Sequence, residues 1–236
     1  MEVKQSVNRS GRKVMKIKVM KNILYCNNKL AQENRELLKK KRIVSLNILA
    51  SPGAGKTSLI MRIIENFKDK IPLAIVEGDI AGSIDAEKID KVGVPVIQIN
   101  TGGGCHLDAN MFKEAINSLN PPDGSLIIIE NVGNLVCPAS FDLGESGRLV
   151  LASTAEGSDK PIKYPQAFQS ADVIVLNKID LVEYIDFDRD FFYKGIEAVS
   201  KAPVLEVSCS KQIGIDELSK WIDNFRKGAV PKEKGE

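Results

Sequence analysis

The stretch from residue 46 to residue 58 constrains the fold of this chain more than any other. An apolar run rich in β-formers ends in Pro-Gly-Ala-Gly-Lys-Thr, and an apolar helical pattern follows directly. A strand, a glycine loop, a Lys-Thr pair and a helix form the arrangement in which backbone N–H groups and a helix N-terminus cradle a phosphate. The sequence therefore predicts a phosphate-binding loop (P-loop). The residues expected to contact the nucleotide there are Gly53, Ala54, Gly55, Lys56, Thr57 and Ser58.

The roles within this loop follow from the side chains. Two glycines let the backbone bend so that several N–H groups face one anion. Lys56 is expected to neutralise the outer phosphates and so to act in catalysis, and the Thr57 hydroxyl is expected to bind Mg²⁺. One departure is visible, because Ala50 occupies the position of the usual first glycine. A glycine turn without function is the alternative, and the strand-loop-helix context argues against it.

The composition is that of an ordinary globular protein, with 43% apolar and 27% charged residues among 236. The net charge of +2 is too small to indicate a nucleic-acid partner. No apolar run approaches the roughly 20 residues that cross a bilayer, and the basic N-terminus lacks an apolar signal core. We therefore expect a cytoplasmic protein without a membrane partner, whose four cysteines are metal ligands or core residues rather than disulfides.

The pattern divides the chain into a flexible N-terminus (residues 1–16), one domain (17–227) and a disordered tail (228–236). The domain begins with a charged helix over residues 17–42 that carries one apolar stripe, which either covers the domain or packs on a second subunit. After the P-loop helix, short apolar runs alternate with helical segments, and the last helix covers residues 215–225. The predicted strands are residues 43–49, 73–76, 96–99, 126–129, 149–152, 173–176 and 204–207.

Apolar strands separated by helices predict the fold class. They are typical of an α/β protein with a mostly parallel sheet, here of about seven strands, covered by helices on both faces. Because parallel strands end at one edge of such a sheet, the loops that follow them should gather beside the nucleotide.

The nucleotide base is predicted from an N-K-x-D sequence at the end of the sixth strand. The Asp180 carboxylate can accept two hydrogen bonds from guanine, whereas adenine offers no such donor pair. Asn177 is expected to brace the loop, and the stem of Lys178 to lie along the base. A later loop places backbone N–H groups at Ser208 and Cys209 near the base carbonyl. Ser210 occupies the position at which that loop usually has a lysine. For Asp180, a helix cap is the alternative interpretation.

Acidic residues at two other strand ends are candidates for Mg²⁺ binding and hydrolysis. Asp79 follows the strand at residues 73–76, and Glu130 begins an acidic-x-x-Gly switch after the strand at residues 126–129. A carboxylate at such a strand end holds Mg²⁺ or its water shell in P-loop proteins. Asp79 is also our candidate for orienting the attacking water, and the Gly133 N–H for sensing the terminal phosphate. Solvated strand-end acids are the alternative.

Cysteine and histidine side chains follow the third and fourth strands. Cys105 and His106 come directly after a run of glycines, and Cys137 follows the Glu130 switch. Thiolate and imidazole suit Zn²⁺ or Ni²⁺. Three ligands leave a fourth position for water, a backbone group or a second subunit, and a buried cysteine beside an incidental histidine is the alternative. The remaining cysteines, Cys26 and Cys209, are interpreted as core or helix-face residues.

The motifs together resemble a known family. The segments SPGAGKTSL, EGDIAGSIDAEKI, TGGGCHLDA, ENVGNLVCPASFDLG and NKIDL are similar to the hydrogenase maturation GTPases of the HypB type, over about residues 19–225. The resemblance implies hydrolysis of GTP, a homodimer formed on GTP binding, and a metal site of Cys105, His106 and Cys137 at the dimer interface. It also implies nickel delivery to a hydrogenase large-subunit precursor with a HypA-type zinc protein. Lys163 is expected to reach the nucleotide region of the partner subunit.

Three other interpretations compete with this one. Urease accessory GTPases are related metallochaperones, but their motif is typically Cys-Pro-His, whereas Cys105 and His106 are adjacent. A signalling GTPase would use no metal and would leave these residues without a purpose. A nucleotide-binding module without turnover is the third option, which a phosphate-release assay excludes or supports.

Overall fold

The structure is a computed structural model that describes residues 15–80 and 84–229. It contains a seven-stranded sheet in which every pairing is parallel, in the order β3-β2-β4-β1-β5-β6-β7. The predicted fold class and all seven predicted strands are confirmed. The strands are β1 (Val44–Ala50), β2 (Leu73–Asp79), β3 (Val96–Asn100), β4 (Leu126–Glu130), β5 (Gly147–Ser153), β6 (Val173–Asn177) and β7 (Val204–Glu206).

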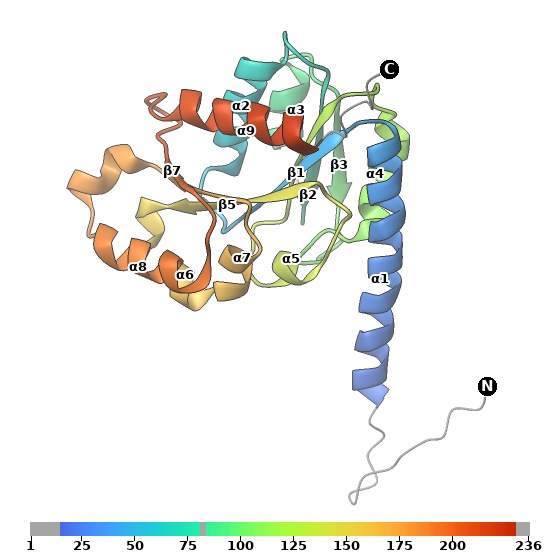
Figure 1. Cartoon of the computed structure of the whole chain (residues 1–236), viewed down its shortest axis with the longest axis horizontal. Coiled ribbons are helices and arrows are strands. Elements are labelled where there is room, and N and C mark those ends of the chain that lie inside the picture. The colour runs from blue at the N-terminus through green and yellow to red at the C-terminus, as the bar shows by residue number, and fades with distance from the viewer. Residues whose placement is uncertain (1–14, 81–83, 230–236) are drawn as a thin grey trace, which may run out of the picture.

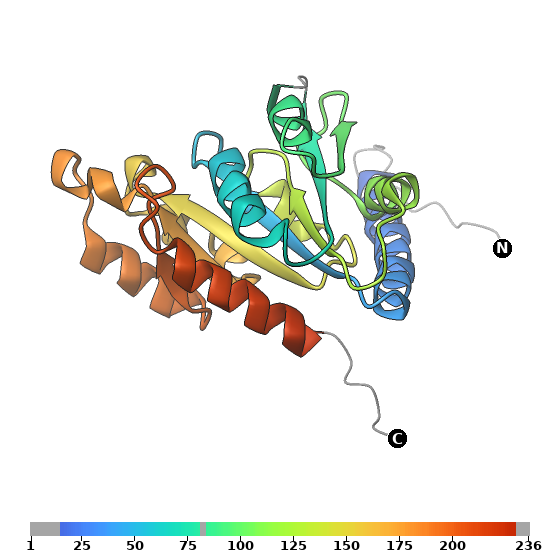
Figure 2. The same cartoon turned by 90° about the horizontal axis from the view of Figure 1, so that it is seen from above.

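Helices cover both faces of this sheet. One face carries α2, α3 and α9, and the other carries α1, α4 and the helices α5 to α8 (Figure 1). Figure 2 looks down on α2 and α9, which lie side by side. The helices are α1 (Met15–Lys40), α2 (Lys56–Phe67), α3 (Ile84–Asp90), α4 (Ala109–Leu119), α5 (Cys137–Ser140), α6 (Lys160–Lys163), α7 (Pro165–Gln169), α8 (Arg189–Val199) and α9 (Ile215–Ala229), with 3₁₀ turns η1 (Thr154–Glu156) and η2 (Ile179–Tyr184).

The two-sided burial explains why the strands are continuous apolar runs. Every residue of β1 is buried, and its side chains alternate between the two helical layers. Leu46 and Ile48 pack under α2 and α9, whereas Leu49 packs against α7 and α8 on the other face. Burying a large aliphatic side chain contributes roughly 1.5–3 kcal/mol. The centre of the sheet is therefore rigid, and it fixes the points at which the loops at its carboxyl edge begin.

Helix α1 packs on its own domain along its carboxyl-terminal part. Ala31 and Leu38 are buried, and the helix lies against α4 (Figure 1). Two asparagines on the same side make the attachment specific, because Asn27 accepts from the backbone N–H of Ala109 and Asn34 donates to the Ala109 carbonyl. The predicted stripe on this helix therefore covers the domain, as the first of the two alternatives stated.

The ends of the domain differ slightly from the prediction. Helix α1 already includes Met15, and α9 continues to Ala229, so Gly228 is helical rather than part of the tail. The last turns of α9 are supported by Asp223, which pairs with Arg226 at 3.2 Å and also with Lys227. Such pairs at spacings of three and four residues stabilise a helix end. The remainder of the predicted flexible N-terminus and tail falls outside the described residues.

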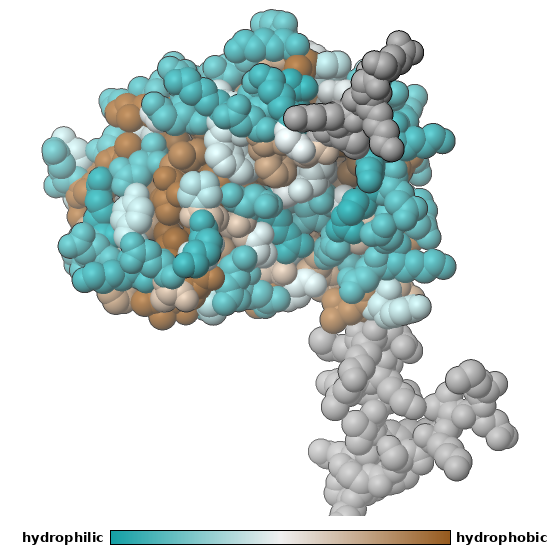
Figure 3. All heavy atoms as spheres, in the orientation of Figure 1, coloured by the Kyte–Doolittle hydropathy of each residue, from teal (hydrophilic) through white to brown (hydrophobic). Residues whose placement is uncertain are grey.

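One face of the surface is mostly polar. On the face in Figure 3, hydrophilic side chains predominate and hydrophobic ones form separate patches. Within the described residues, the structure has no helix with the length and apolar character needed to span a membrane.

Candidate nucleotide and metal sites

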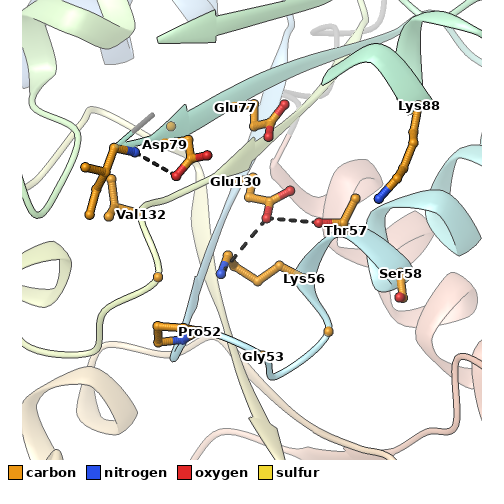
Figure 4. A pocket seen from close by; sticks show the side chains of 14 residues that line it. Pro52, Gly53, Lys56, Thr57, Ser58, Glu77, Asp79, Lys88, Glu130 and Val132 are labelled. Carbon is orange, nitrogen blue, oxygen red and sulfur yellow. Dashed lines mark hydrogen bonds and ion pairs between the residues drawn. The ribbon is translucent and has the colours of Figure 1, made fainter. Parts of the chain in front are cut away.

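A cavity of about 550 Å³, which we call the phosphate cavity because the P-loop lines it, lies at the carboxyl edge of the sheet, above the ends of β1, β2 and β4 (Figure 4). Its position follows from the topology, because β1 runs between β4 and β5 and the loops after these strands diverge there. The P-loop forms one wall, and acidic residues at the ends of β2 and β4 form another. The lining residues are Pro52, Gly53, Gly55, Lys56, Thr57, Ser58, Glu77, Gly78, Asp79, Ile80, Lys88, Glu130, Val132 and Gly133.

The backbone of the P-loop needs glycine at two positions. Gly53 has φ +78° and Gly55 has φ +102°, both in the left-handed region that L-residues rarely adopt. Gly55 is also crowded, since a Cβ there would lie 2.5 Å from Asn177 Nδ2. Gly55 is the N-cap of α2, so the helix N-terminus opens toward the cavity. Ala50, at the position of the usual first glycine, is the buried last residue of β1 and needs no unusual conformation.

Three side chains of the predicted phosphate and Mg²⁺ site meet inside the cavity. Thr57 Oγ1 donates to Glu130 Oε1 at 3.4 Å, and Lys56 Nζ lies 4.0 Å from the same oxygen (Figure 4). Glu130 is buried at the end of β4. A hydroxyl and a carboxylate oxygen side by side are the ligands that Mg²⁺ prefers, so this pair fits the ion.

The end of β2 contributes two acids to the same cavity. Asp79, the predicted hydrolysis residue, accepts from the Ile80 N–H at 2.7 Å through Oδ1. Glu77 lies two residues earlier, is buried and also lines the cavity, and sequence reasoning missed it. The signal was present, because alternate residues of a strand point to the same face and Glu77 is an acid in an apolar strand. Lys88 of α3 is a second lining residue that the sequence did not reveal.

The N-K-x-D sequence lies beside the P-loop rather than apart from it. Asn177 Nδ2 donates to the Ala54 carbonyl at 2.9 Å, and Lys178 Nζ donates to the Gly53 carbonyl at 2.8 Å. The Cys209 N–H in turn donates to Asn177 Oδ1 at 3.2 Å. Asn177 therefore braces the P-loop and the loop after β7 at once, as the sequence predicts for a bracing residue.

A second cavity of about 250 Å³ extends from the P-loop to Asp180 and shares Gly55 and Ser58 with the first. Ser210 Oγ donates to Asp180 Oδ2 at 3.3 Å. Hydrogen bonds from Ser208 and Ser210 hold the pKa of Asp180 below its usual value, with Lys211 adding to the effect. The carboxylate is thus ionised and able to accept two donors from a base. Burial raises the pKa of the Cys209 thiol to about 11, so that side chain is neutral core, as predicted.

The predicted metal ligands are brought together next to the phosphate cavity. Cys105 and His106 lie in the loop between β3 and α4, and Cys137 begins α5. Their ligand atoms all lie within 4.8 Å of one another, and Cys105 Sγ is 3.5 Å from His106 Nδ1. A hydrogen bond with Cys137 raises the pKa of the Cys105 thiol. Two sulfurs and one imidazole in this space match the donor set for Zn²⁺ or Ni²⁺.

The histidine is fixed by its surroundings. Its ring stacks on Phe141 with centroids 3.7 Å apart, and burial lowers the pKa of His106, which favours the neutral imidazole that binds metals. Asp108 closes the loop, because its side chain caps α4 by accepting from the Met111 N–H at 2.8 Å. Cys26, by contrast, is exposed on α1. The four cysteines are free thiols.

Two asparagines connect the switch loop after β4 to the Cys-His loop. Buried Asn131 accepts from the Leu107 N–H at 3.1 Å, and Asn134 Nδ2 donates to the Cys105 carbonyl at 3.2 Å. Sequence reasoning did not find either contact. Gly133 lies between them and packs on the P-loop, since a Cβ there would lie 3.1 Å from Pro52 Cγ. The structure therefore joins the phosphate cavity and the metal ligands through one short loop.

The lysines of α6 have different surroundings. Lys163, which the sequence assigned to a partner's nucleotide, is exposed and pairs with Asp159 at 2.6 Å, a contact that raises the pKa of Lys163. Lys160 reaches the P-loop of its own chain, with Nζ 3.4 Å from Ser51 Oγ and 3.6 Å from Glu156. The role of Lys163 across a dimer stays a prediction.

Comparison with known proteins finds relatives of this chain. A family model described as "CobW/HypB/UreG, nucleotide-binding domain" matches residues 44–194. The chain is 45% identical over 208 residues to the hydrogenase maturation factor HypB of Rhizobium leguminosarum bv. viciae, covering 88% of this chain and 70% of that protein.

Two solved structures are also similar. The crystal structure of HypB from Archaeoglobus fulgidus has a TM-score of 0.81 at 35% identity, covering 86% of this chain and 100% of that one. HypB from Helicobacter pylori, solved in complex with nickel, has a TM-score of 0.78 at 33% identity, covering 89% and 99%. The chain therefore belongs to the HypB hydrogenase maturation factors, within the CobW/HypB/UreG family of nucleotide-binding proteins.

Proposed function

We propose that the chain is a GTP-hydrolysing metallochaperone that helps to insert nickel into the precursor of a hydrogenase large subunit. The observation that carries the proposal is the loop after β4, which contributes residues to both the phosphate cavity and the predicted metal site. Gly133 of this loop lines the phosphate cavity, and Cys137 at its end lies beside Cys105 and His106. A terminal phosphate and a bound metal would therefore act on the same few residues. The nickel in the Helicobacter pylori HypB structure supports nickel as the cargo.

Guanine selection rests on Asp180, whose ionised carboxylate would accept the N1 and N2 donors of the base. Hydrolysis would depend on charged groups that already hold their positions before the reaction begins. Lys56 would neutralise charge on the transferred phosphoryl group, and Thr57 with Glu130 would hold Mg²⁺. Bound Mg²⁺ would supply further neutralisation of the charge on the phosphates. Asp79 would orient the attacking water, since its carboxylate lines the same cavity.

Cargo binding rests on Cys105, His106 and Cys137. Both Ni²⁺ and Zn²⁺ suit this donor set, and three protein ligands leave one position that a second subunit can supply. Two exposed apolar side chains support a homodimer formed on GTP binding: Ile80 at the phosphate cavity is 50% exposed, and Val136 beside Cys137 is 57% exposed. A HypA-type zinc protein and the hydrogenase precursor are the proposed partners. Free thiols fit the reducing cytoplasm as the compartment.

Metal binding and turnover, measured together, test the proposal. We expect the purified chain to release phosphate from GTP faster than from ATP. We also expect it to bind a fixed number of Ni²⁺ ions per subunit. Cys105→Ser should lose the metal and keep GTP binding. Cys26→Ser is the matched control, because Cys26 is an exposed cysteine on α1. Wild-type metal binding in Cys105→Ser would remove the proposed cargo site and favour a signalling-type GTPase. Each variant should also be tested for activation of hydrogenase in cells that lack the factor.

A further inference from the structure

One side chain contacts the backbone next to two of the three metal ligands. Asn134 Nδ2 donates to the carbonyl of Cys105 at 3.2 Å, and Asn134 Oδ1 accepts from the N–H of Val136 at 2.8 Å. Cys105 is itself a ligand, and Val136 directly precedes the ligand Cys137. A single amide group therefore fixes the separation between the two cysteine-bearing segments.

The loop that carries Asn134 has one firmly held end. Asn131 is fully buried, donates to Asn47 of β1 at 3.3 Å, and accepts from the N–H groups of Leu107 and Val132. These contacts anchor the start of the loop to the sheet.

The other end of this loop is more open. The bond from Asn134 to Cys105 is only partly buried, and Val136 is 57% exposed. Gly133, immediately before Asn134, packs on Pro52 of the P-loop. A terminal phosphate that attracts the Gly133 N–H would therefore displace the loop mainly between residues 133 and 136.

We propose that Asn134 is the positioning residue that transmits the nucleotide state to the metal ligands; this inference rests on the proposed function. When Gly133 shifts toward a terminal phosphate, Asn134 moves with it. Its amide then pulls the Cys105 carbonyl on one side and the Val136 N–H on the other. The two ligand sulfurs change their separation, so the affinity for Ni²⁺ differs between the GTP and GDP states. By linkage, bound Ni²⁺ changes the affinity for GTP relative to GDP by the same factor.

The chemistry of the amide explains why this position needs asparagine. The side chain must donate to a carbonyl and accept from an N–H at the same time, which an aspartate cannot do. A serine can still accept from the N–H two residues on, but it is too short to reach the Cys105 carbonyl. A purely local role in the turn at residues 134–136 is the competing explanation, and Asn134→Ser separates the two roles.

The test compares Ni²⁺ affinity in two nucleotide states. Affinities are measured by competition with a chromophoric chelator, first with GDP and Mg²⁺ and then with a non-hydrolysable GTP analogue. The ratio of the two affinities is obtained for the unmodified chain, Asn134→Ser and Asn134→Ala. Asn110→Ala is the matched control, because Asn110 follows the same Cys-His loop but its side chain donates to Glu114 Oε1 on the exposed face of α4, at 2.9 Å.

We expect the ratio to move toward one in both Asn134 variants, by about two- to tenfold, the equivalent of one hydrogen bond. GTP affinity without metal should change less than about twofold by the same scale, and Asn110→Ala should keep the original ratio. The reciprocal experiment, the affinity for the GTP analogue relative to that for GDP, measured with and without Ni²⁺, must give the same ratios. The absolute affinity for Ni²⁺ with GDP, which should stay close to that of the unmodified chain, detects a variant whose metal site is merely misfolded.

The outcomes distinguish the inference from the function on which it rests. An unmodified chain with equal Ni²⁺ affinity in both states would contradict nucleotide-controlled nickel release itself. A ratio that departs from one in the unmodified chain and persists in both Asn134 variants would overturn the role of Asn134 and leave the metallochaperone proposal intact. Loss of the ratio in Asn134→Ala alone would assign the residue to the local turn and also overturn the inference.

Discussion

Asn177→Ala should weaken nucleotide binding, because it frees two loops of the nucleotide site from each other. The side chain is 2% exposed and joins two loops, through the Ala54 carbonyl at 2.9 Å and the Cys209 N–H at 3.2 Å. Each net hydrogen bond contributes about 0.5–1.5 kcal/mol, so the two together contribute about 1–3 kcal/mol. Both bonds are buried, and alanine leaves their partners without this amide.

The lost free energy can appear either as lower folding stability or as weaker nucleotide binding. If both loops stay in place, the free energy of unfolding falls by about 1–3 kcal/mol. If the loops relax until GTP orders them again, the same energy is lost from binding, which corresponds to about 5- to 150-fold in affinity. Urea unfolding and titration with a fluorescent guanine nucleotide measure the two parts separately.

The matched control is Asn66→Ala. Asn66 donates to the Arg62 carbonyl at 3.0 Å within α2, so its loss affects one helix turn and no loop. Because Asn66 is half-buried and its loss removes one hydrogen bond within a helix, we expect the free energy of unfolding to fall by about 0.5–1.5 kcal/mol and the nucleotide affinity to stay unaltered. The bracing role of Asn177 is wrong if Asn177→Ala matches this control in both measurements.

The remaining predictions concern base choice, turnover and acid stability. Asp180→Asn should weaken GTP binding and improve binding of xanthosine triphosphate, and unchanged preference in a competition assay would contradict the base assignment. Lys56→Ala should abolish phosphate release, whereas Asp79→Ala should slow phosphate release and keep most of the nucleotide affinity. If Asp79→Ala releases phosphate as fast as the unmodified chain, Asp79 takes no part in the chemical step. Burial by itself would raise the pKa of Asp142. The hydrogen bonds and the charge of Arg35 lower this pKa by more than burial raises it, so the net pKa lies below the usual 3.8. This half-exposed ion pair at 2.9 Å should therefore contribute about 0.5 kcal/mol to stability above pH 3.8 and lose it as the pH falls through the lowered pKa of Asp142. Arg35→Ala should destabilise the chain to urea at pH 7, and the difference from the unmodified chain should shrink as the pH falls below 3.8.

The sheet and the nucleotide loops were predictable because their signals are local. Each buried strand is a short apolar run, and parallel strands fix which loops share an edge. Once the P-loop follows β1, the loops that carry Asp79, Glu130 and Asp180 must gather around it. The same argument brought Cys105 and Cys137 together, from loops far apart in the sequence.

The rest depends on contacts that no sequence pattern records. Asn34 on α1 and Asn134 in the switch loop are polar residues that the sequence alone suggests are solvated, yet both bond to backbone groups of distant segments. Helices α5 and α6 span only Cys137–Ser140 and Lys160–Lys163, too short for a helical period to be visible. For that reason the sequence could not reveal that Lys160 reaches Ser51 of its own P-loop.

The affinity of the unmodified chain for Ni²⁺, measured with GDP and again with a non-hydrolysable GTP analogue, tests the central claim most directly. Because one loop carries Gly133 at the phosphate cavity and Cys137 at the metal ligands, the two affinities should differ, typically by about 5- to 150-fold for coupled sites. Cys105→Ser should abolish binding in both states. Equal affinities in the two nucleotide states, with the same metal per subunit, would contradict the account.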